Sequence, residues 1–591
     1  MTAEVTRCSA ATSSYYPKTH TMRSDTQDTA SMHFDNVIEL YQNAWRDNFE
    51  LPALTDYGDS SVTLTYGDMA AQIARLHLLM KHIGIRRGDK IALVGRNSAS
   101  WVVVFMAAVT YGATIVPILH DFSHDDIQHI VRHSESRILF AAENIYRHLD
   151  FNAMPGLCAV FLLDGYKLAD SRKVDGYSEA SEAALALDGE FEKAYHSYFG
   201  PQDIKYDLSI PADHTAIINY TSGTTGFSKG VMLSLDNLAG NLAYGVRSKL
   251  HYRNSRALSF LPLAHAYGCA FDMVVPLAVG THVTLVGKTP SPRILLQAFA
   301  EVRPSLILCV PLILEKIYRR MIVPVLQKKH IRAALAVPGL RLIIYRVIRQ
   351  RLVKAFGGEF EEVIVGGAPI SREVEAFLHR IRFPFTVGYG MTECAPLISH
   401  TPWRHFSPAS SGHVLDGIME VAINSEDPEN IPGEILVRGR NVMQGYYKEP
   451  GLTADAISED GWLHTGDMGT VDHDGGTIRI CGRYKTMILG PSGQNIYPEA
   501  IEDRVNALPY VLESLVVERD GHLQVLVVPD TDALERDNIM DEDERFKLFD
   551  AARVKLNGTL APFERIDSVV IMPEEFEKTP KRSIKRYLYT A

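Results

Sequence analysis

The chain has 591 residues, of which 46% are hydrophobic and 22% charged, a composition typical of a globular protein and long enough for several domains. Its formal net charge of −11 argues against a nucleic-acid-binding protein, which would carry an excess of basic residues. No uninterrupted apolar run approaches the roughly eighteen residues that a membrane span needs.

Residues 1–31 are rich in Ser and Thr and lack the apolar segment of a secretory signal, so we expect a disordered tail there. We consider Met22 and Met32 as alternatives to Met1 for the start of the protein. Six cysteines are widely scattered and form no Cys-x-x-Cys pair: Cys8, Cys158, Cys269, Cys309, Cys394 and Cys481. This pattern predicts reduced, buried thiols in a cytoplasmic protein rather than disulfides or a zinc site.

From about residue 35, apolar runs alternate with helical stretches. Strand-like runs occur at residues 90–95, 113–118, 217–220, 283–286, 306–309 and 363–366. Continuous apolar strands that alternate with helices predict parallel sheets covered by helices. Ligands of such folds bind beyond the carboxyl ends of the strands, and this chain carries glycines there.

The pattern changes twice towards the C-terminus. Residues 434–480 look like a small β-rich region, and after Arg483 short strands are separated by polar helical stretches. We therefore predict an α/β protein with a tail at 1–31 and two domains. The domain at 32–482 has stacked parallel sheets flanked by helices, together with the small β-rich subdomain. Residues 483–591 form a small, mobile α+β domain of ordinary size.

Residues 220–230 read Tyr-Thr-Ser-Gly-Thr-Thr-Gly-Phe-Ser-Lys-Gly. Small residues allow backbone N–H groups to approach a polyphosphate, hydroxyls donate to its oxygens, and Lys229 adds compensating charge. Two residues separate Gly226 from Lys229, so this is not the usual P-loop, in which Gly and Lys are adjacent. The alternative is a flexible surface loop.

The loop resembles the signature of the adenylate-forming superfamily, the acyl-CoA synthetases and their relatives. Further motifs of that superfamily follow in order: Leu261-Pro-Leu-Ala-His265-Ala-Tyr-Gly268, Gly366-Gly367-Ala368-Pro369, Gly388-Tyr389-Gly390-Met391-Thr392-Glu393, Gly461-Trp462-Leu-His464-Thr-Gly466-Asp467, Gly482-Arg483-Tyr-Lys485 and Ser583-Ile584-Lys585. The resemblance runs from about residue 35 to the C-terminus. Within the superfamily, the chain is most similar to long-chain fatty acyl-CoA synthetases.

This resemblance implies a two-step reaction that uses ATP, Mg²⁺ and coenzyme A. A fatty carboxylate attacks the α-phosphate of ATP, giving acyl-adenylate and pyrophosphate, and the thiol of coenzyme A then displaces AMP. Three alternatives stay open. The protein could be an acyl-AMP ligase that serves a carrier protein, a ligase for medium-chain or aryl acids, or an inactive nucleotide- or lipid-binding protein.

The resemblance also assigns roles to residues of the nucleotide site. The β- and γ-phosphates are held by Thr221, Ser222, Gly223, Thr224, Thr225, Gly226 and Lys229. Thr392 donates to the α-phosphate, and Glu393 binds Mg²⁺, a cation that prefers oxygen ligands. Tyr389 stacks on adenine next to Gly390, and the backbone at Gly366, Gly367 and Ala368 approaches the edge of the base. For Tyr389 the alternative is a core aromatic residue.

Three more residues complete the implied site. Asp467 accepts the ribose hydroxyls, and the alternative is a turn residue of the Asx type. Arg483 reaches the ribose or the phosphates. His265 lies near the acyl carboxylate, and the alternative is a core histidine.

The last implied residue is Lys585, which contacts the acyl carboxylate and the α-phosphate during adenylation. Ile584 stands where the family commonly has Gly, and Lys581 and Arg586 compete for the assignment. The alternative is a solvated lysine near the C-terminus. Lys485 occupies the hinge about which the C-terminal domain rotates between the two half-reactions.

Residues 315–356 carry eleven Lys or Arg residues against the single acid Glu315, in a protein that is acidic overall. Apolar residues within this segment follow helical spacing: Tyr345, Ile348, Leu352 and Phe356. A basic amphipathic helix can lie on an anionic membrane, so we consider peripheral contact with the inner membrane surface. The alternative is a helix whose apolar stripe packs on the large domain.

Overall fold

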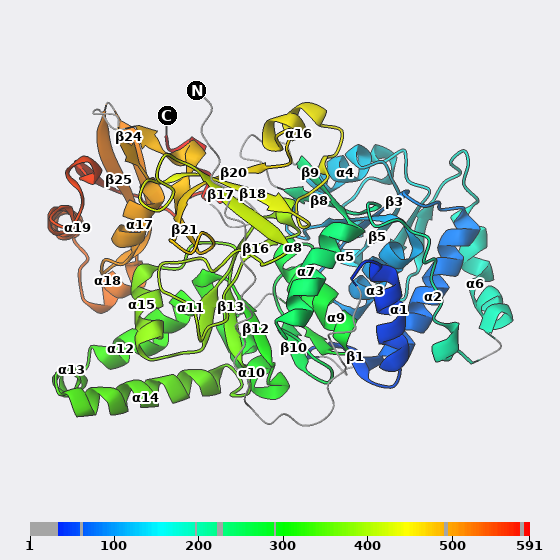
Figure 1. The fold of residues 1–591 in the computed structure, drawn as a ribbon, viewed down its shortest axis with the longest axis horizontal. Coiled ribbons are helices and arrows are strands. Elements are labelled where there is room, and N and C mark those ends of the chain that lie inside the picture. Colours follow the sequence, from blue (N-terminus) through cyan, green and yellow to red (C-terminus); the bar gives the residue numbers. More distant parts are fainter. Residues whose placement is uncertain are drawn as a thin grey trace.

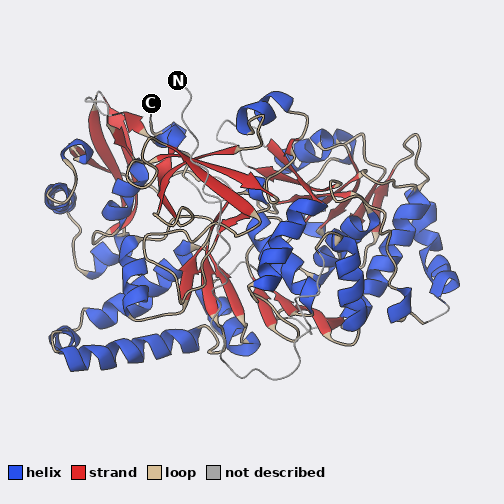
Figure 2. Ribbon diagram, in the orientation of Figure 1, coloured by secondary structure: helices blue, strands red, loops and turns tan. Residues whose placement is uncertain are grey.

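The structure is a computed structural model that describes residues 34–58, 63–195, 198–221, 229–288, 291–489, 494–519, 521–578 and 584–590. The expected tail at 1–31, with Cys8, lies outside these residues. Two large sheets and the helices around them make up most of the molecule, and the C-terminal elements lie together at one end (Figures 1 and 2).

The first large sheet has a parallel centre and antiparallel edges. Its strands in spatial order are β19 (Gly445–Tyr446), β9 (Lys229–Ser234), β8 (Thr215–Thr221), β4 (Thr114–Ile118), β3 (Lys90–Val94), β5 (Ser136–Ala141), β6 (Ala159–Leu162) and β7 (Leu168–Ser171). The run from β8 to β6 is parallel. Strands β9 and β19 extend it antiparallel to their neighbours on the side of β8.

The second large sheet is parallel except at one edge. Its strands in spatial order are β14 (Phe385–Val387), β13 (Glu362–Val365), β12 (Leu306–Cys309), β10 (Arg256–Ser259), β11 (His282–Leu285), β1 (Pro52–Asp56) and β2 (Thr63–Thr65). Only β2 pairs antiparallel within the described strands of this sheet.

Helices flank both sheets, as the alternating sequence pattern predicts (Figure 2). They are α1 (Val37–Asp47), α2 (Tyr66–Ile83), α3 (Ala99–Tyr111), α4 (His124–His133), α5 (Glu143–Tyr146), α6 (Ala180–Tyr195), α7 (Leu235–Arg247), α8 (Ala266–Cys269), α9 (Val275–Val279), α10 (Pro292–Val302), α11 (Pro311–Ile317), α12 (Val323–Leu326), α13 (Lys329–Leu335), α14 (Pro338–Ala355), α15 (Arg372–Arg380) and α16 (Pro450–Ala456). No helix within the described residues has the length and apolar character needed to span a bilayer.

Helix α3 shows how the sequence produces the layered core. The apolar run 101–109 is buried on all sides of the helix, because α3 contacts β3 and β4 of one sheet and β1 of the other. Ser98 caps its first turn by accepting a hydrogen bond from the Trp101 backbone N–H, at 3.2 Å. Gly112 ends it with a φ of +84°, a conformation that glycine adopts at little cost.

Two smaller antiparallel sheets follow the large ones. One pairs β15 (Tyr389–Gly390) with β16 (Leu397–Ser399). The other has the order β17 (Met419–Asn424), β18 (Gly433–Gly439), β20 (Leu463–Val471) and β21 (Ile478–Arg483). The second sheet corresponds to the β-rich region predicted at 434–480, and its first strand begins earlier.

The C-terminal part has its own apolar cores. It contains β22 (Ile488–Leu489), β23 (Asn495–Ile496), α17 (Pro498–Asn506), β24 (Val511–Arg519), β25 (His522–Pro529), α18 (Thr531–Arg536), α19 (Glu542–Asn557) and β26 (Ser568–Ile571). The main core joins buried residues from Phe34 to Ile478, whereas two separate clusters lie within 488–589. This separation supports a domain boundary at residue 483, which stays a prediction.

Helix α14 orients its apolar stripe differently from a membrane-docking helix. Ile348 and Leu352 are buried, and Phe356 just beyond the helix is buried among other aromatic rings. Tyr345 lies edge-on to Phe377 of α15. The stripe seen in the sequence therefore packs on the large domain, as the alternative interpretation had it.

Candidate nucleotide-binding site

Two of the predicted motifs meet at the carboxyl edge of the second sheet. Gly366 follows β13, and its N–H donates to the carbonyl of Cys309 at the end of β12, at 3.0 Å. Gly388 follows β14, and its N–H donates to the carbonyl of Val365 at 2.9 Å. Because neighbouring parallel strands end at one edge, the Gly366 and Gly388 motifs lie side by side there.

The turn after β13 presents exposed backbone. Gly366 itself is buried, and a Cβ there would lie 3.2 Å from the ring of Tyr267, so the close packing favours glycine. Gly367 has a φ of +83°, and both Gly367 and Ala368 are exposed. This is the kind of backbone that a planar base can approach.

Tyr389, Asp467 and Arg483 form one cluster, and Tyr389 is buried as part of the main core, so its role towards adenine stays a prediction. The hydroxyl of Tyr389 donates to Oδ2 of Asp467 at 2.7 Å, and Nε of Arg483 lies 3.1 Å from Oδ1. Asp467 and Arg483 face each other across β20 and β21. Burial raises the pKa of Asp467, and the positive charge of Arg483 opposes that rise. The Asp467 side chain thus contacts other segments rather than a turn of its own.

A second cluster contains Lys229 and Glu393, joined by a residue that the sequence motifs do not single out. The hydroxyl of Tyr446 donates to Oε1 of Glu393 at 3.0 Å. The Nζ of Lys229 lies 4.8 Å from the centre of the Tyr446 ring. The carbonyl of Glu393 accepts from the N–H of Met443 at 2.8 Å, and the neighbouring Thr392 is buried.

His265 lies at the start of α8, and its Nδ1 accepts from the N–H of Tyr267 at 3.4 Å. The side chain of Asn219 in β8 donates to the carbonyl of Ala264 at 3.2 Å. This contact ties the His265 segment to the strand that leads into the phosphate loop. The half-buried ring is compatible with either interpretation of His265.

The structure does not bring Lys585 to these clusters. Its Nζ lies 3.2 Å from Oε2 of Glu577, within the C-terminal part of the chain. No hydrogen bond or ion pair between described residues joins Lys585 to Thr392, Glu393 or Asp467. Lys485 is exposed in a short helical turn after β21.

The predicted phosphate ligands are only partly covered by the structure. Thr221 ends β8 and Lys229 begins β9, so the loop joins two paired strands of the first sheet. Five of the predicted ligands lie outside the described residues: Ser222, Gly223, Thr224, Thr225 and Gly226.

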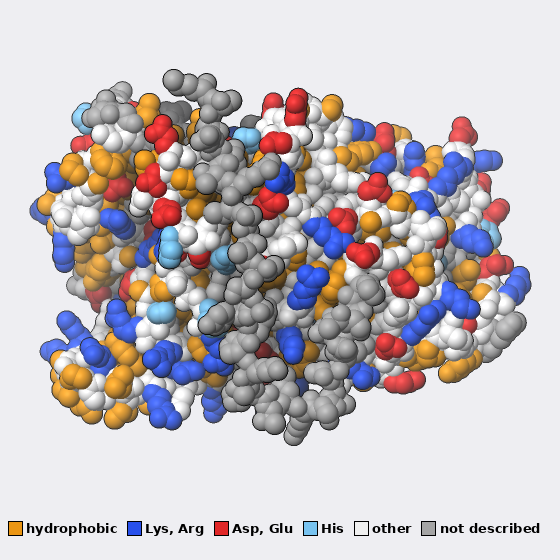
Figure 3. Space-filling model, viewed as in Figure 1, with side chains coloured by type: hydrophobic (Ala, Val, Ile, Leu, Met, Phe, Trp, Pro, Cys, Tyr) orange, Lys and Arg blue, Asp and Glu red, His pale blue; other side chains and the backbone are white. Residues whose placement is uncertain are grey.

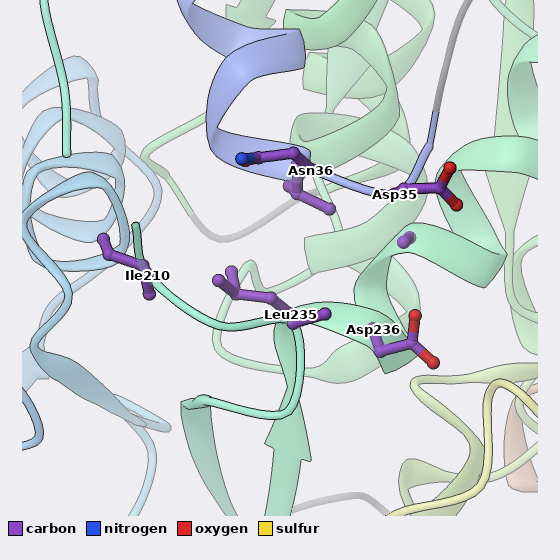
Figure 4. Close-up of a pocket in the computed structure, with 8 residues that line it drawn as sticks. Asp35, Asn36, Ile210, Leu235 and Asp236 are labelled. Atoms are coloured by element: carbon purple, nitrogen blue, oxygen red, sulfur yellow. The ribbon is translucent and has the colours of Figure 1, made fainter. Parts of the chain in front are cut away.

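A small pocket elsewhere on the surface is not a substrate site. It is lined by Asp35, Asn36, Ile210, Leu235 and Asp236, among others, near the start of α1 and α7 (Figure 4). Its volume of about 10 Å³ holds roughly one water molecule. Acyl and nucleotide groups are far larger.

Known proteins resemble this chain over most of its length. The model of the family described as AMP-binding enzyme matches residues 41–447. The long-chain-fatty-acid–CoA ligase FadD15 of Mycobacterium tuberculosis is 26% identical over 599 residues, which cover 93% of this chain and 94% of the relative. The human long-chain-fatty-acid–CoA ligase 1 is 26% identical over 576 residues, which cover 87% and 79%.

Solved structures give the same fold. ATP-bound MatB from Rhodopseudomonas palustris matches with a TM-score of 0.70 and 22% identity, covering 94% of this chain and 98% of that one. The AMP complex of o-succinylbenzoate coenzyme A synthetase from Bacillus subtilis matches with a TM-score of 0.69 and 19% identity, covering 93% and 98%. The predicted α/β fold and the predicted superfamily are confirmed. The chain belongs to the family of AMP-binding enzymes.

Proposed function

We propose that this protein is an AMP-forming long-chain fatty acid–CoA ligase that uses Mg²⁺ and ATP. The names of relatives that align over almost the whole chain support this activity. The observation that carries it is the cluster of Tyr389, Asp467 and Arg483, because an aromatic ring, a carboxylate and a guanidinium recognise base, ribose and phosphate.

Each residue has a role that its chemistry permits. Asp467 keeps free lone pairs beside the Tyr389 and Arg483 contacts, so its oxygens can also accept ribose hydroxyls. We assign Lys229 and Thr392 to the phosphates, where negative charge builds up as the acyl carboxylate attacks. Tyr446 engages only Oε1 of Glu393 among the described contacts, and the carboxylate offers the oxygen ligands that Mg²⁺ prefers. When bound, Mg²⁺ supplies charge that neutralises the phosphate oxygens.

The C-terminal domain would then carry Lys585 into and out of the site. Here that domain contacts the large domain through Arg319, which donates to the carbonyls of Asn506 and Val511 at 2.7 and 3.0 Å. We assign this arrangement to a state in which Lys585 is withdrawn, and rotation about Lys485 delivers it for adenylation.

Two assays on the purified protein test the function. Acid-dependent pyrophosphate exchange reports the first half-reaction, and CoA-dependent AMP release reports the whole reaction, across saturated acids from about C6 to C20. We expect both activities to be greatest with long chains. Pyrophosphate exchange without thioester formation would favour an acyl-AMP ligase. Greatest activity with shorter or aryl acids would mean that the substrate is not a long-chain fatty acid. The absence of both activities would overturn the proposal.

We further propose that α14 touches the inner membrane surface through a face other than its buried stripe. Leu340, Ile343 and Val347 are 47, 60 and 41% exposed and lie along one side of the helix. Arg351 and Lys354 are exposed on the same side. Hydrophobic and basic side chains occur together at this corner of the molecule (Figure 3), a combination that suits anionic lipid.

Vesicle flotation tests the membrane proposal. We expect the protein to float with phosphatidylglycerol vesicles at low salt and to lose most of that binding at about 0.5 M salt, since salt screens the charges. Ile343→Glu should abolish flotation. Leu342→Glu is the matched control. Leu342 is 69% exposed, but its side chain lies about 100° around the helix axis from that of Ile343. No flotation of the original protein, or equal loss in both variants, would contradict this docking face.

A further inference from the structure

Tyr446 lies between two charged groups of the proposed phosphate and metal site. Its hydroxyl donates to Glu393, and its ring face lies under the ammonium group of Lys229. No ion pair joins Lys229 to Glu393 among the described residues. The Tyr446 side chain therefore contacts both charged groups, Glu393 through its hydroxyl and Lys229 through its ring. Lys229 and Glu393 are not paired with each other among the described contacts.

We propose that Tyr446 is a positioning residue that orients the Glu393 carboxylate and prevents Lys229 from neutralising it. This inference rests on the proposed function, which gives Lys229 to the phosphates and Glu393 to Mg²⁺. A lysine and a glutamate that paired directly would compensate each other's charge. Less of that charge would then act on the phosphates and on Mg²⁺. Tyr446 instead satisfies one carboxylate oxygen with a neutral donor and the ammonium with the negative face of a ring.

The surrounding backbone fixes Tyr446 in this place. Strand β19 pairs with β9, which places Tyr446 opposite Val231, two residues after Lys229. The N–H of Tyr446 donates to Oγ1 of Thr453 in α16 at 2.9 Å. Gly445 has a φ of +143°, and a Cβ there would lie 2.7 Å from the Thr453 side chain. The ring is buried, so it has little freedom to turn away.

The contact with Glu393 comes from a neutral donor. A phenol hydroxyl donates a hydrogen bond without bringing a positive charge to the carboxylate. The charge on Glu393 is thus preserved for a cation, while its orientation is set by the protein.

The neighbouring tyrosine provides a matched control. Tyr447 also donates its hydroxyl to a glutamate, Oε2 of Glu135, at 3.0 Å. Its N–H donates to the carbonyl of Gly230 at 2.7 Å, so it belongs to the same local structure. Tyr447→Phe therefore removes an equivalent hydrogen bond next to the site without touching Lys229 or Glu393.

The test measures metal binding directly. Mn²⁺ serves as the probe, titrated by electron paramagnetic resonance against the protein with a non-hydrolysable ATP analogue. We expect Tyr446→Phe to weaken Mn²⁺ binding about 10-fold, the size typical of losing a partner that orients a metal ligand. Tyr446→Leu, which also removes the ring, should weaken binding of the analogue itself. Tyr447→Phe should change neither.

Kinetics supply the second readout. The Mg²⁺ concentration for half-maximal pyrophosphate exchange should rise by the same factor in Tyr446→Phe, with the KM for the fatty acid unchanged. Unchanged Mn²⁺ affinity in Tyr446→Phe, or an equal shift in Tyr447→Phe, would overturn the proposal. If the original protein binds Mn²⁺ with the analogue but activates no acid, the proposed function fails while the role of Tyr446 is still measured.

Discussion

Replacement of Lys585 by alanine should lower acid-dependent pyrophosphate exchange at least about 100-fold, the loss typical of removing one group that stabilises developing negative charge. The ammonium would act on the carboxylate and α-phosphate inside a closed site, where effective dielectric is low and a single charge counts for more. Thioester formation from synthetic acyl-adenylate should stay within a few-fold of the original rate. Separate assays of the two half-reactions provide the measurement.

Two other lysines show whether the effect belongs to Lys585. Lys578 lies in the same part of the chain but contacts Glu513 and Glu575, each at 2.9 Å, so Lys578→Ala should leave both half-reactions unchanged. Lys581 is the rival from the sequence. Loss of exchange in Lys581→Ala but not in Lys585→Ala would move the assignment there. An equal fall of both half-reactions in Lys585→Ala would indicate a structural role instead.

The position of Lys585 also marks a limit of sequence-based inference. The motif places a lysine near the C-terminus, but only coordinates reveal that its side chain contacts Glu577 rather than the nucleotide cluster. A residue that acts in one arrangement of two domains need not lie at the site in another. Its catalytic role therefore remains a prediction, and the half-reaction assays are its test.

Local pattern was sufficient for the layers, whereas the site residues were predicted from the family resemblance. Apolar strands followed by helices imply parallel sheets. The expectation that Tyr389, Asp467 and Arg483 share one site came from the resemblance to the adenylate-forming superfamily. Tyr446 was missed because its role depends on the pairing of β19 with β9, two strands about 215 residues apart in sequence. No spacing along the chain reveals such a pair.

Helix α14 illustrates a different limit. Periodicity identified Tyr345, Ile348, Leu352 and Phe356 as one stripe, but periodicity cannot tell whether a stripe faces protein or lipid. The stripe packs against the large domain, and the exposed apolar side chains belong to another side of the helix. The exposed fractions of its side chains, and not its periodicity, identify the side of α14 that is open to lipid.

The C-terminal segment that bears Lys585 is held by an ion pair between the partly buried Arg586 and the buried Glu502. Arg586 donates to Glu502 of α17, and its Nη2 lies 3.6 Å from Oε1 of Glu499. Oε1 of Glu502 also accepts from the N–H of Val516 at 2.7 Å. Burial raises the pKa of Glu502 to about 7, although the Arg586 charge opposes the rise.

We expect Arg586→Ala to destabilise the C-terminal domain by about 1–2 kcal/mol at pH 8, because Glu502, left without its cation, must then take up a proton one pH unit above its pKa of about 7. The loss should shrink as pH falls. A carboxyl whose pKa is higher in the folded state takes up a proton there first, so the folded state is favoured as pH drops from about 7 towards 4.5. Neutral Glu502 no longer needs Arg586, and the charge part of the loss disappears.

Hydrogen exchange in the peptide covering β24 and β25 measures this loss, because those strands hold the buried apolar residues of the domain. Arg586→Ala should speed exchange strongly at pH 8 and far less at pH 5.5, after correction for the intrinsic pH dependence. Adding Glu502→Gln to the Arg586→Ala variant should restore most of the lost protection at pH 8. The amide oxygen of Gln can still accept from the Val516 N–H, and it carries no charge that needs Arg586. Equal destabilisation at both pH values without rescue would mean that Arg586 acts through the packing of its aliphatic stem instead. In that case charge pairing would not be what fixes the Lys585 segment to α17.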